Sequence, residues 1–392
     1  MRLFYKPQYR DLFLGAGLLC ATAALLHWPQ ESMAAVREGL NLCGNVILPS
    51  LFPFFVLSAL IVELGLSQYL GKLLEPVMRP LFHLNGSCAC ALAMGFIGGY
   101  PVGARTAINL YQNGQCTKTE AERLLAFCNN SGPAFILGVV GAGVFGSSQV
   151  GLILYFTHVC ASLLVGLIFR FYKSPEPPSR KTGTWSFHAA PFAPAFTHSV
   201  TGALTSTLNI CAFILFFTVV LRCLTLSGLL SALSSLLAML FAPFGLTQPW
   251  AQKLLVGLLE VSTGVSTLGG AGMLEGKLSM AAFMLGWAGL SVHCQVLAFS
   301  GDSGLSMKTY LVGKFLHGGI SALLTSLIFG KITLGAGVSA CLAEQAETLA
   351  ALDFSRAFSI SMICAFAVWT LFFTVACCML KKRSRKAGRH AL

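Results

Sequence analysis

The chain has 392 residues, of which 55% are hydrophobic and only 10% are charged, and its formal net charge is +12. A soluble domain has about 25% charged residues, so this composition excludes a soluble enzyme, a nucleic-acid-binding protein and a disordered chain. The apolar runs have about the length of a membrane helix, roughly 20 residues, and not of the ~10-residue alternating strands of a membrane barrel. We therefore expect an all-α polytopic membrane protein.

The N-terminal part begins with a basic flank and an apolar run. Three basic residues precede residues 11–28, which lack a small-residue cleavage site, so we predict a membrane helix and not a cleaved signal peptide. A second span is predicted near 46–66. Residues 69–84 mix apolar and charged side chains and predict an amphipathic helix at the membrane surface.

Several apolar segments are interrupted by Gly, Pro or polar residues. In a membrane, an interrupted helix is tolerated only where the freed backbone groups are buried in protein or line a wet cavity. These segments are therefore the candidate regions for a binding site. They are residues 89–111, 120–145, 251–272 and 279–300.

Other segments are uninterrupted and predict complete membrane spans. They are residues 147–171, 203–224, 306–330 and 355–380. A polar, proline-rich stretch at 173–190 separates the two sides of the chain and predicts an exposed linker.

The two sides of this linker contain the same order of segments. Each has two interrupted segments and then an uninterrupted helix, in which His158 and His317 occupy matching positions. We expect both histidines to form hydrogen bonds between helices. Basic residues mark cytoplasmic helix ends; they follow helix 147–171, whereas loop 334–354 contains acidic residues and no basic one. The two halves are therefore predicted to form an inverted repeat, as in many secondary transporters.

This orientation places both termini in the cytoplasm and divides the chain into six parts. They are an N-terminal membrane helix (1–30), a first repeat (31–172), a cytoplasmic linker (173–190), a second, inverted repeat (191–333), an external loop (334–354), and a C-terminal membrane helix with a basic cytoplasmic tail (355–392).

The candidate substrate-binding residues lie at the interruptions of the first half. Asn129, Asn130 and Ser131 stand before a Gly-Pro pair and can bind a carbonyl, a carboxylate or a ring nitrogen, or can join helices by hydrogen bonds. The tip of a second interruption contains glycines that allow close backbone approach and an arginine that matches a carboxylate, unless that arginine extends to the surface. The candidates at this tip are Gly99, Tyr100, Pro101, Gly103 and Arg105.

The second half offers an acid and a histidine. Glu260 is an intramembrane acid beside Ser262 and Thr263, and it predicts either a functional site or a structural pair with an arginine or a backbone N–H. His293 can donate, accept or carry a proton, although a histidine in an apolar helix is also a common packing residue. Its neighbour Gln295 is included as a candidate.

Motifs for enzymatic or metal chemistry are not found in the sequence. It contains no Walker A motif, no Gly-x-Ser-x-Gly and no His-Glu-x-x-His, so we expect neither an enzyme nor an ATP-driven pump. The 14 cysteines include no Cys-x-x-Cys and mostly stand in apolar runs. We therefore expect no metal and no cofactor.

Four motifs resemble the sporulation integral membrane proteins of the nucleoside-recognition (Gate) domain family, and most closely its stage V sporulation branch. They are Pro49–Phe55, Gly99–Arg105, Phe127–Ile136 and Glu260–Gly264. The resemblance implies a fold related to concentrative nucleoside transporters, with two Gate-like repeats. It also implies transport of dipicolinic acid from the mother cell across the outer forespore membrane. The family commonly has Asn-Thr-Ser-Asn-Pro where this chain has Gly132 in place of the second Asn.

Three functions are therefore considered. The first is a transporter of a small anionic metabolite, dipicolinic acid, the second a permease for nucleosides or other small metabolites, and the third a sporulation membrane scaffold that transports nothing. The expected partners are the anionic substrate and the lipid bilayer. A coupling ion, either a proton or Na⁺, and a homo-oligomer are also considered.

Overall fold

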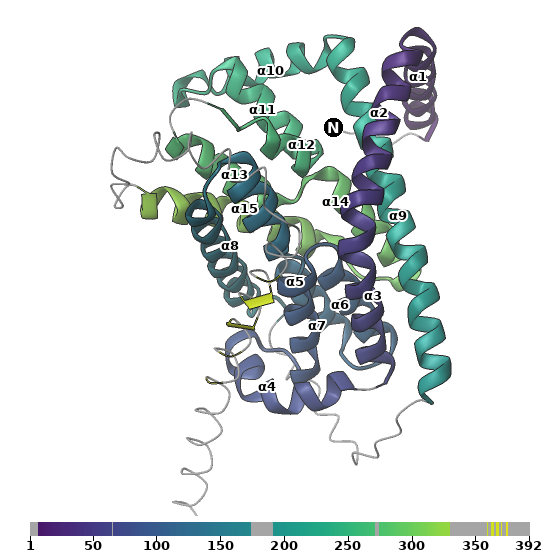
Figure 1. The fold of residues 1–392 in the computed structure, drawn as a ribbon, viewed down its shortest axis with the longest axis vertical. Helices are drawn as coiled ribbons and strands as arrows, with labels where there is room; N and C mark the ends of the chain where they lie inside the picture. Colours follow the sequence, from purple (N-terminus) through teal and green to yellow (C-terminus); the bar gives the residue numbers. More distant parts are fainter. Residues whose placement is uncertain are drawn as a thin grey trace, which may run out of the picture.

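The computed structural model describes residues 7–64, 66–173, 191–270 and 274–329, and isolated positions between 359 and 374. Within these ranges every secondary-structure element is a helix (Figure 1). The predicted linker 173–190, the external loop 334–354 and the C-terminal part 355–392 lie outside the described residues, apart from Lys173 and the isolated positions.

The first half contains eight α-helices and three short helical segments, of which η2 and η4 are π-helical. They are α1 (Pro7–His27), α2 (Pro29–Leu42), η2 (Cys43–Ile47), α3 (Leu48–Glu63), α4 (Leu66–Phe82), η3 (Gly86–Cys88), α5 (Ala89–Gly98), α6 (Val102–Gln112), α7 (Lys118–Cys128), η4 (Ala134–Val144) and α8 (Ser148–Phe169).

The described part of the second half begins with the longest helix. Its elements are α9 (Phe192–Leu226), α10 (Leu229–Leu240), η5 (Ala242–Phe244), α11 (Gln248–Leu259), α12 (Val261–Ser266), α13 (Leu274–Trp287), α14 (Gly289–Ser300), η6 (Gly301–Ser303) and α15 (Met307–Phe329).

Four helical stretches among the described residues are long and apolar enough to cross a membrane. They are Ser148–Phe169, Phe192–Leu226, Gly276–Ser300 and Met307–Phe329. A fifth arises if the bent pair Lys72–Phe82 and Gly86–Gly98, with 94° between its parts, is counted as one span. The predicted uninterrupted helices 147–171 and 306–330 are confirmed as α8 and α15, and 203–224 lies within the longer α9.

The other N-terminal predictions also correspond to helices. The predicted helix 11–28 is α1, and the amphipathic segment 69–84 is α4. Residues 46–66 fall on η2 and α3, and their crossing of the membrane as one span stays a prediction. One face of α4 buries Leu74 and Met78, while Glu75 and Arg79 form an ion pair of 2.6 Å on its partly exposed face. Its position at the membrane surface stays a prediction.

The interruptions occur where the sequence indicates them, and they have clear causes. Helix α7 ends at Asn129, whose ψ of 86° is not helical, and Pro133, which has no N–H, caps the start of η4. Gly99 has a φ of +77° between α5 and α6. In the second half the chain leaves the helix at Glu260 and at Ala288, whose φ is +75°. Each half thus contains a helix pair, an interrupted helix and an uninterrupted helix. The inverted orientation of the halves and their exact boundaries stay predictions.

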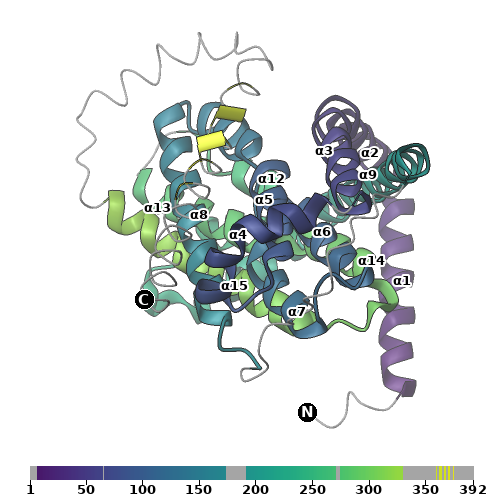
Figure 2. The same ribbon diagram turned by 90° about the horizontal axis from the view of Figure 1, so that it is seen from below.

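The elements are arranged on two sides of the molecule. Helix α9 packs along α2 and α3 on one side, and α8, α13 and α15 pack against one another on the other (Figures 1 and 2). Helix α15 contacts α7 as well as α8 and α13. The interrupted helix of the first half therefore lies against the last uninterrupted helix of the second half.

Each half also brings its two interruptions together. A Cβ on Gly99 would lie 2.7 Å from the backbone nitrogen of Gly132, and a Cβ on Gly289 would lie 3.0 Å from that of Val261. Both contacts require a residue without a side chain. The tip between α5 and α6 is thus held directly against the break after α7. In the second half, the start of α14 is likewise held against the start of α12.

Candidate functional site

The break after α7 is fully buried and polar. Helix α7 begins at a capping box, in which Thr117 and Glu120 bond each other's backbone N–H groups. It ends at Asn129, Asn130 and Ser131, each 0% exposed. Among the described residues, Asn129 Oδ1 and Asn130 Oδ1 have no hydrogen-bond partner. Because buried polar atoms are nearly always bonded, these two acceptors favour a ligand-binding role for the break.

A lysine from α15 lies against this break. Lys314 is 0% exposed, and its Nζ donates to the Asn129 carbonyl oxygen over 2.8 Å. Nζ also lies 3.4 Å from His317 Nδ1 and 5.9 Å from the centroid of the Tyr100 ring. Within the described ranges, no carboxylate lies within ion-pair distance of Lys314. A buried ammonium without a counter-ion is costly.

The two aligned histidines meet beside the lysine. The rings of His158 and His317 are 4.3 Å apart between centroids, and His317 Nε2 donates to the His158 carbonyl over 2.9 Å. The Ser131 backbone N–H donates to His158 Nε2 over 2.9 Å. The predicted role of both histidines in hydrogen bonds between helices is thereby confirmed. Because Nε2 of neutral His158 accepts, its proton is on Nδ1, and this buried atom has no partner among the described residues.

A hydrogen-bonded chain joins the break to the second half. Asn129 Nδ2 donates to the Tyr310 hydroxyl over 3.1 Å, and this hydroxyl lies 3.0 Å from His293 Nδ1. The hydroxyl accepts from Asn129 and can therefore donate its proton to Nδ1, which places the proton of neutral His293 on Nε2. Nε2 is buried and has no partner among the described residues. Candidates from both halves thus lie in one cluster.

Glu260 has a different environment. Its carboxylate accepts from the backbone N–H groups of Ser262 over 3.0 Å and Thr263 over 2.7 Å, so it caps the start of α12. Glu260 is buried, whereas the Thr263 side chain is exposed. Of the two predicted alternatives for this acid, the structure contains the pairing with backbone N–H groups. The positive end of α12 is occupied by the protein's own carboxylate.

The tip between α5 and α6 places its residues in two directions. The Tyr100 ring lies beside Lys314, whereas Arg105 points toward α9 and donates to the Gly202 carbonyl over 3.0 Å. The Arg105 guanidinium also lies 5.0 Å and 5.8 Å from the ring centroids of Phe55 and Phe299. None of these partners belongs to the cluster around Asn129, although Arg105 Nη1 has no partner among the described residues.

The remaining candidates form the backbone of the tip or lie farther along α14. Pro101 and Gly103 are buried, and a Cβ on Gly103 would clash with the Cys128 carbonyl, so this glycine is required for close packing against the end of α7. Gln295 is buried and contacts Ser291 Oγ over 3.4 Å.

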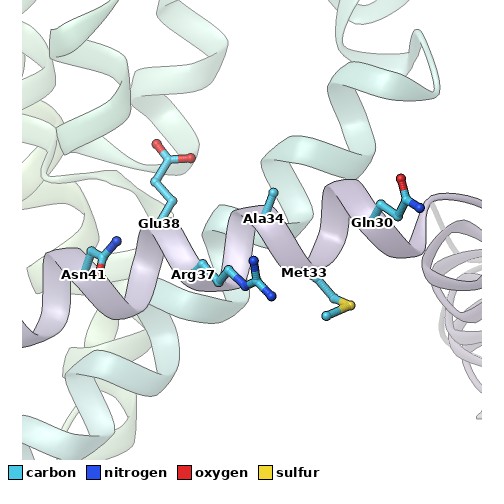
Figure 3. A pocket seen from close by; sticks show the side chains of 6 residues that line it. All are labelled: Gln30, Met33, Ala34, Arg37, Glu38 and Asn41. Atoms are coloured by element: carbon cyan, nitrogen blue, oxygen red, sulfur yellow. The ribbon is translucent and has the colours of Figure 1, made fainter.

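A separate hollow lies along α2 (Figure 3). All of its lining residues come from this one helix, and Glu38 among them pairs with Arg222 of α9 over 3.3 Å. No predicted site residue lines it. Since side chains from separate elements do not converge there, we assign no function to it.

Tyr310 and Lys314 are site residues that the sequence analysis missed. The signal was present, because an ionisable residue inside a membrane span is functional by default. Tyr310, Lys314, His317 and Ser321 also follow one another at intervals of four, three and four residues, and all are 0% exposed. This spacing places them on one face of α15. These residues lie on an uninterrupted helix, whereas the predicted site residues all come from interrupted segments.

A sequence comparison identifies the family. Sporulation integral membrane protein YlbJ of Bacillus subtilis (strain 168) is 32% identical to this chain over 340 residues, which cover 82% of the chain and 83% of YlbJ. The chain belongs to the YlbJ family of sporulation integral membrane proteins. The Gate family, described as nucleoside recognition, matches residues 46–170. The resemblance predicted from the motifs is confirmed, and the Gate match includes the break at Asn129 to Ser131.

Other similarities are shorter or more distant. The uncharacterized protein BpOF4_10220 of Alkalihalophilus pseudofirmus is 30% identical over 130 residues, 33% of this chain and 27% of that protein. Among solved structures, a CNTnw variant in an outward-facing state has a TM-score of 0.44 and 14% identity, over 83% of this chain and 87% of that chain. CNTnw in an inward-facing substrate-bound state has a TM-score of 0.41 and 14% identity, over 86% of this chain and 88% of that chain.

These findings settle the class of the protein. This YlbJ-family chain is a multi-pass, all-helical membrane protein with a Gate domain, as the composition predicts. Within the ranges that the structure describes, no three His, Cys, Asp or Glu side chains are grouped closely enough to hold a metal ion.

Proposed function

We propose that this YlbJ-family protein transports a small anionic metabolite, and that this metabolite is dipicolinic acid moving from the mother cell toward the forespore. The observation that supports an anion is the buried Lys314 side chain, whose Nζ has no carboxylate partner among the described residues. Dipicolinate is a flat dianion with a ring nitrogen. One of its carboxylates would supply the counter-charge that Lys314 lacks.

The atoms without partners around Lys314 support the rest of this assignment. His158 Nδ1–H and His293 Nε2–H are buried donors without partners in the described part of the chain. Each can donate to a carboxylate or to the ring nitrogen. We propose that Asn129, Asn130 and Ser131 form one wall of the site. The tip residues Gly99 and Tyr100 close it from the opposite side.

The other predicted site residues are assigned supporting roles. We propose that Pro101 and Gly103 hold the tip against α7, and that Arg105 fixes α6 against α9 through Gly202. Glu260, with Ser262 and Thr263, fixes the start of α12. Gln295 stabilises α14 through Ser291.

The substrate is tested with purified full-length protein in proteoliposomes. Uptake of labelled dipicolinate and of labelled uridine is compared for the natural chain, Lys314→Met and Lys308→Met. Lys308 lies on the same helix but is exposed, so it is the matched control. The proposal predicts dipicolinate uptake that is lost in Lys314→Met and retained in Lys308→Met. Uptake of uridine without uptake of dipicolinate would contradict it.

A nucleoside is the second candidate substrate. The family that matches residues 46–170 is described as nucleoside recognition, and the free Asn129 and Asn130 oxygens can accept from the N–H and O–H groups of a nucleoside. An uncharged nucleoside would leave Lys314 without a counter-charge. Uridine uptake that does not depend on Lys314 would favour this alternative.

Location and assembly are part of the same proposal. We propose that the protein lies in the outer forespore membrane with both termini in the cytoplasm of the mother cell. Fluorescence of a C-terminal fusion in sporulating cells, with protease access to each terminus, tests both points. A homo-oligomer stays a prediction that light scattering of the purified protein tests.

A further inference from the structure

The hydrogen bonds of Lys314 suit an amine better than an ammonium. Nζ has two acceptors among the described residues, the Asn129 carbonyl oxygen at 2.8 Å and His317 Nδ1 at 3.4 Å. A neutral amine has two N–H groups, whereas an ammonium has three. The third N–H of the ammonium therefore has no acceptor in the part of the chain that the structure describes.

His317 is fixed as one of these acceptors. Its Nε2 donates to the His158 carbonyl over 2.9 Å, so the single proton of neutral His317 is on Nε2. Nδ1 therefore presents a lone pair to Lys314. In this arrangement both N–H groups of the neutral amine are satisfied by groups of the protein.

A bound carboxylate changes this balance. It offers an acceptor for a third N–H and a counter-charge for the ammonium, whereas the described residues of the protein themselves offer neither. We propose that Lys314 takes up a proton when the substrate anion binds and loses it when the anion leaves, so that transport is coupled to protons. This inference rests on the proposed function, because it concerns the same site and requires an anionic substrate.

The proton balance of this step is simple. The lone pair of the Lys314 amine forms a new N–H bond with a proton from the aqueous phase on the loading side. On the opposite side that N–H bond breaks and the proton returns to water as the anion leaves. No electron is transferred, and one proton moves with each anion.

The other titratable groups around Lys314 come from several elements. Helix α13 also packs on α15, but its acidic and basic residues, Glu275 and Lys277, are confined to its first turn. Helices α7 and α8 contribute Cys128 and His158, and the tip between α5 and α6 contributes Tyr100. Helix α15 itself contributes Tyr310 and His317, and His293 of α14 is joined to Tyr310. None of these groups carries a negative charge at neutral pH in its ordinary form.

The test counts protons directly. Dipicolinate is titrated into the purified full-length protein at about pH 8, where it is a dianion, in buffers of different ionisation enthalpy. The slope of the observed heat against that enthalpy gives the protons taken up for each bound substrate. We expect about one proton for the natural chain and about one for Lys308→Arg, whose side chain is exposed. We expect about zero for Lys314→Arg, because a guanidinium remains charged.

The outcomes separate the two proposals. If dipicolinate neither binds nor is taken up, the proposed function is wrong. If it binds with about zero protons in the natural chain, the coupling inference alone is wrong. Proton uptake that persists in Lys314→Arg would assign the proton to another group and overturn the role of Lys314.

A second readout needs no variant. In proteoliposomes, a pH gradient that is acidic on the substrate side should drive accumulation of dipicolinate, and a protonophore should abolish that accumulation. Exchange of labelled for unlabelled dipicolinate should persist without a gradient. Gradient-independent accumulation in the natural chain would contradict proton coupling even if Lys314→Arg fails to fold.

Discussion

The break after α7 and the break at Glu260 differ in how their polar atoms are satisfied. At the first break, Asn129 Oδ1 and Asn130 Oδ1 are buried without partners in the described residues, and Lys314 Nζ lies alongside. At the second, both oxygens of Glu260 accept from the next two backbone N–H groups. Both breaks have the same kind of sequence, an apolar segment with polar and small residues at its centre.

This difference shows that a break can have either of two purposes. A polar side chain can replace the hydrogen bonds that the interrupted helix lost, as Glu260 does for α12. It can also leave its polar atoms for a ligand, as we propose for Asn129 and Asn130. Sequence alone shows that a break is polar, and the hydrogen-bond partners decide which of the two purposes it serves.

The largest effect is expected at the first break. Lys314→Met removes the charge that would bind a carboxylate, and a hydrogen bond to a charged group contributes about 1.5–3 kcal/mol. We therefore expect dipicolinate affinity to fall roughly 10- to 100-fold, as measured by isothermal titration. Lys308→Met, on the exposed part of α15, should bind as the natural chain does. An unchanged affinity in Lys314→Met would mean that the first break, like the second, does not bind the substrate.

A smaller loss is expected at the amide beside it. Asn129→Ala removes the donor to the Tyr310 hydroxyl, which in turn lies 3.0 Å from His293 Nδ1. This loss loosens the His293 ring that we propose donates to the substrate, and an uncharged hydrogen bond contributes about 0.5–1.5 kcal/mol. Affinity for dipicolinate should fall about 2- to 10-fold in the same titration. Asn113→Ala, in the exposed turn after α6, is the control. Equal affinities of the two variants would show that the hydrogen bond from Asn129 to Tyr310 does not support substrate binding.

A substitution at the second break should lower the stability of the protein but leave its affinity for dipicolinate unchanged. Glu260→Gln weakens the cap of α12 and should cost about 1 kcal/mol, seen as a lower midpoint of thermal unfolding in detergent. Dipicolinate affinity should stay within about twofold. Glu63→Gln is the control, because Glu63 pairs with an exposed histidine and such pairs contribute little. A tenfold loss of affinity in Glu260→Gln would mean that this break also binds the substrate.

Arg105 should give the smallest effect. Arg105→Lys weakens the contacts with the Phe55 and Phe299 rings, which contribute about 0.5–1 kcal/mol at a partly exposed site. We expect a slightly lower unfolding midpoint and an affinity within about twofold. Loss of dipicolinate binding in this variant would place the guanidinium in the substrate site.

Much of the fold follows from local sequence. Charge-free apolar runs and Gly or Pro interruptions predict α8, α15 and the breaks at Gly99 and Pro133, because these features act within one or two turns of a helix. The pairing of His158 with His317 is also predictable, since the two residues occupy matching positions in similar helices. The length of α9 was underestimated because its first residues are more polar than a span requires.

The composition of the site was less predictable. Asn129 and His293 are adjacent through Tyr310, although they are separated by 164 residues in the chain. The direction of the Arg105 side chain depends on Gly202 of α9, a contact that no local pattern encodes. Lys314 was missed because its helix is uninterrupted, and its importance depends on the absence of a nearby carboxylate among the described residues.

The most direct test of the site compares a charged ligand with an uncharged one of the same shape. Binding of dipicolinate and of its neutral diamide, pyridine-2,6-dicarboxamide, is measured by titration for the natural chain and for Lys314→Met. If Lys314 binds the substrate as an anion, the natural chain prefers the dianion by about tenfold or more, and Lys314→Met loses that preference. Equal binding of the two ligands by the natural chain, or a preference that survives in Lys314→Met, would contradict an anion site at the break after α7.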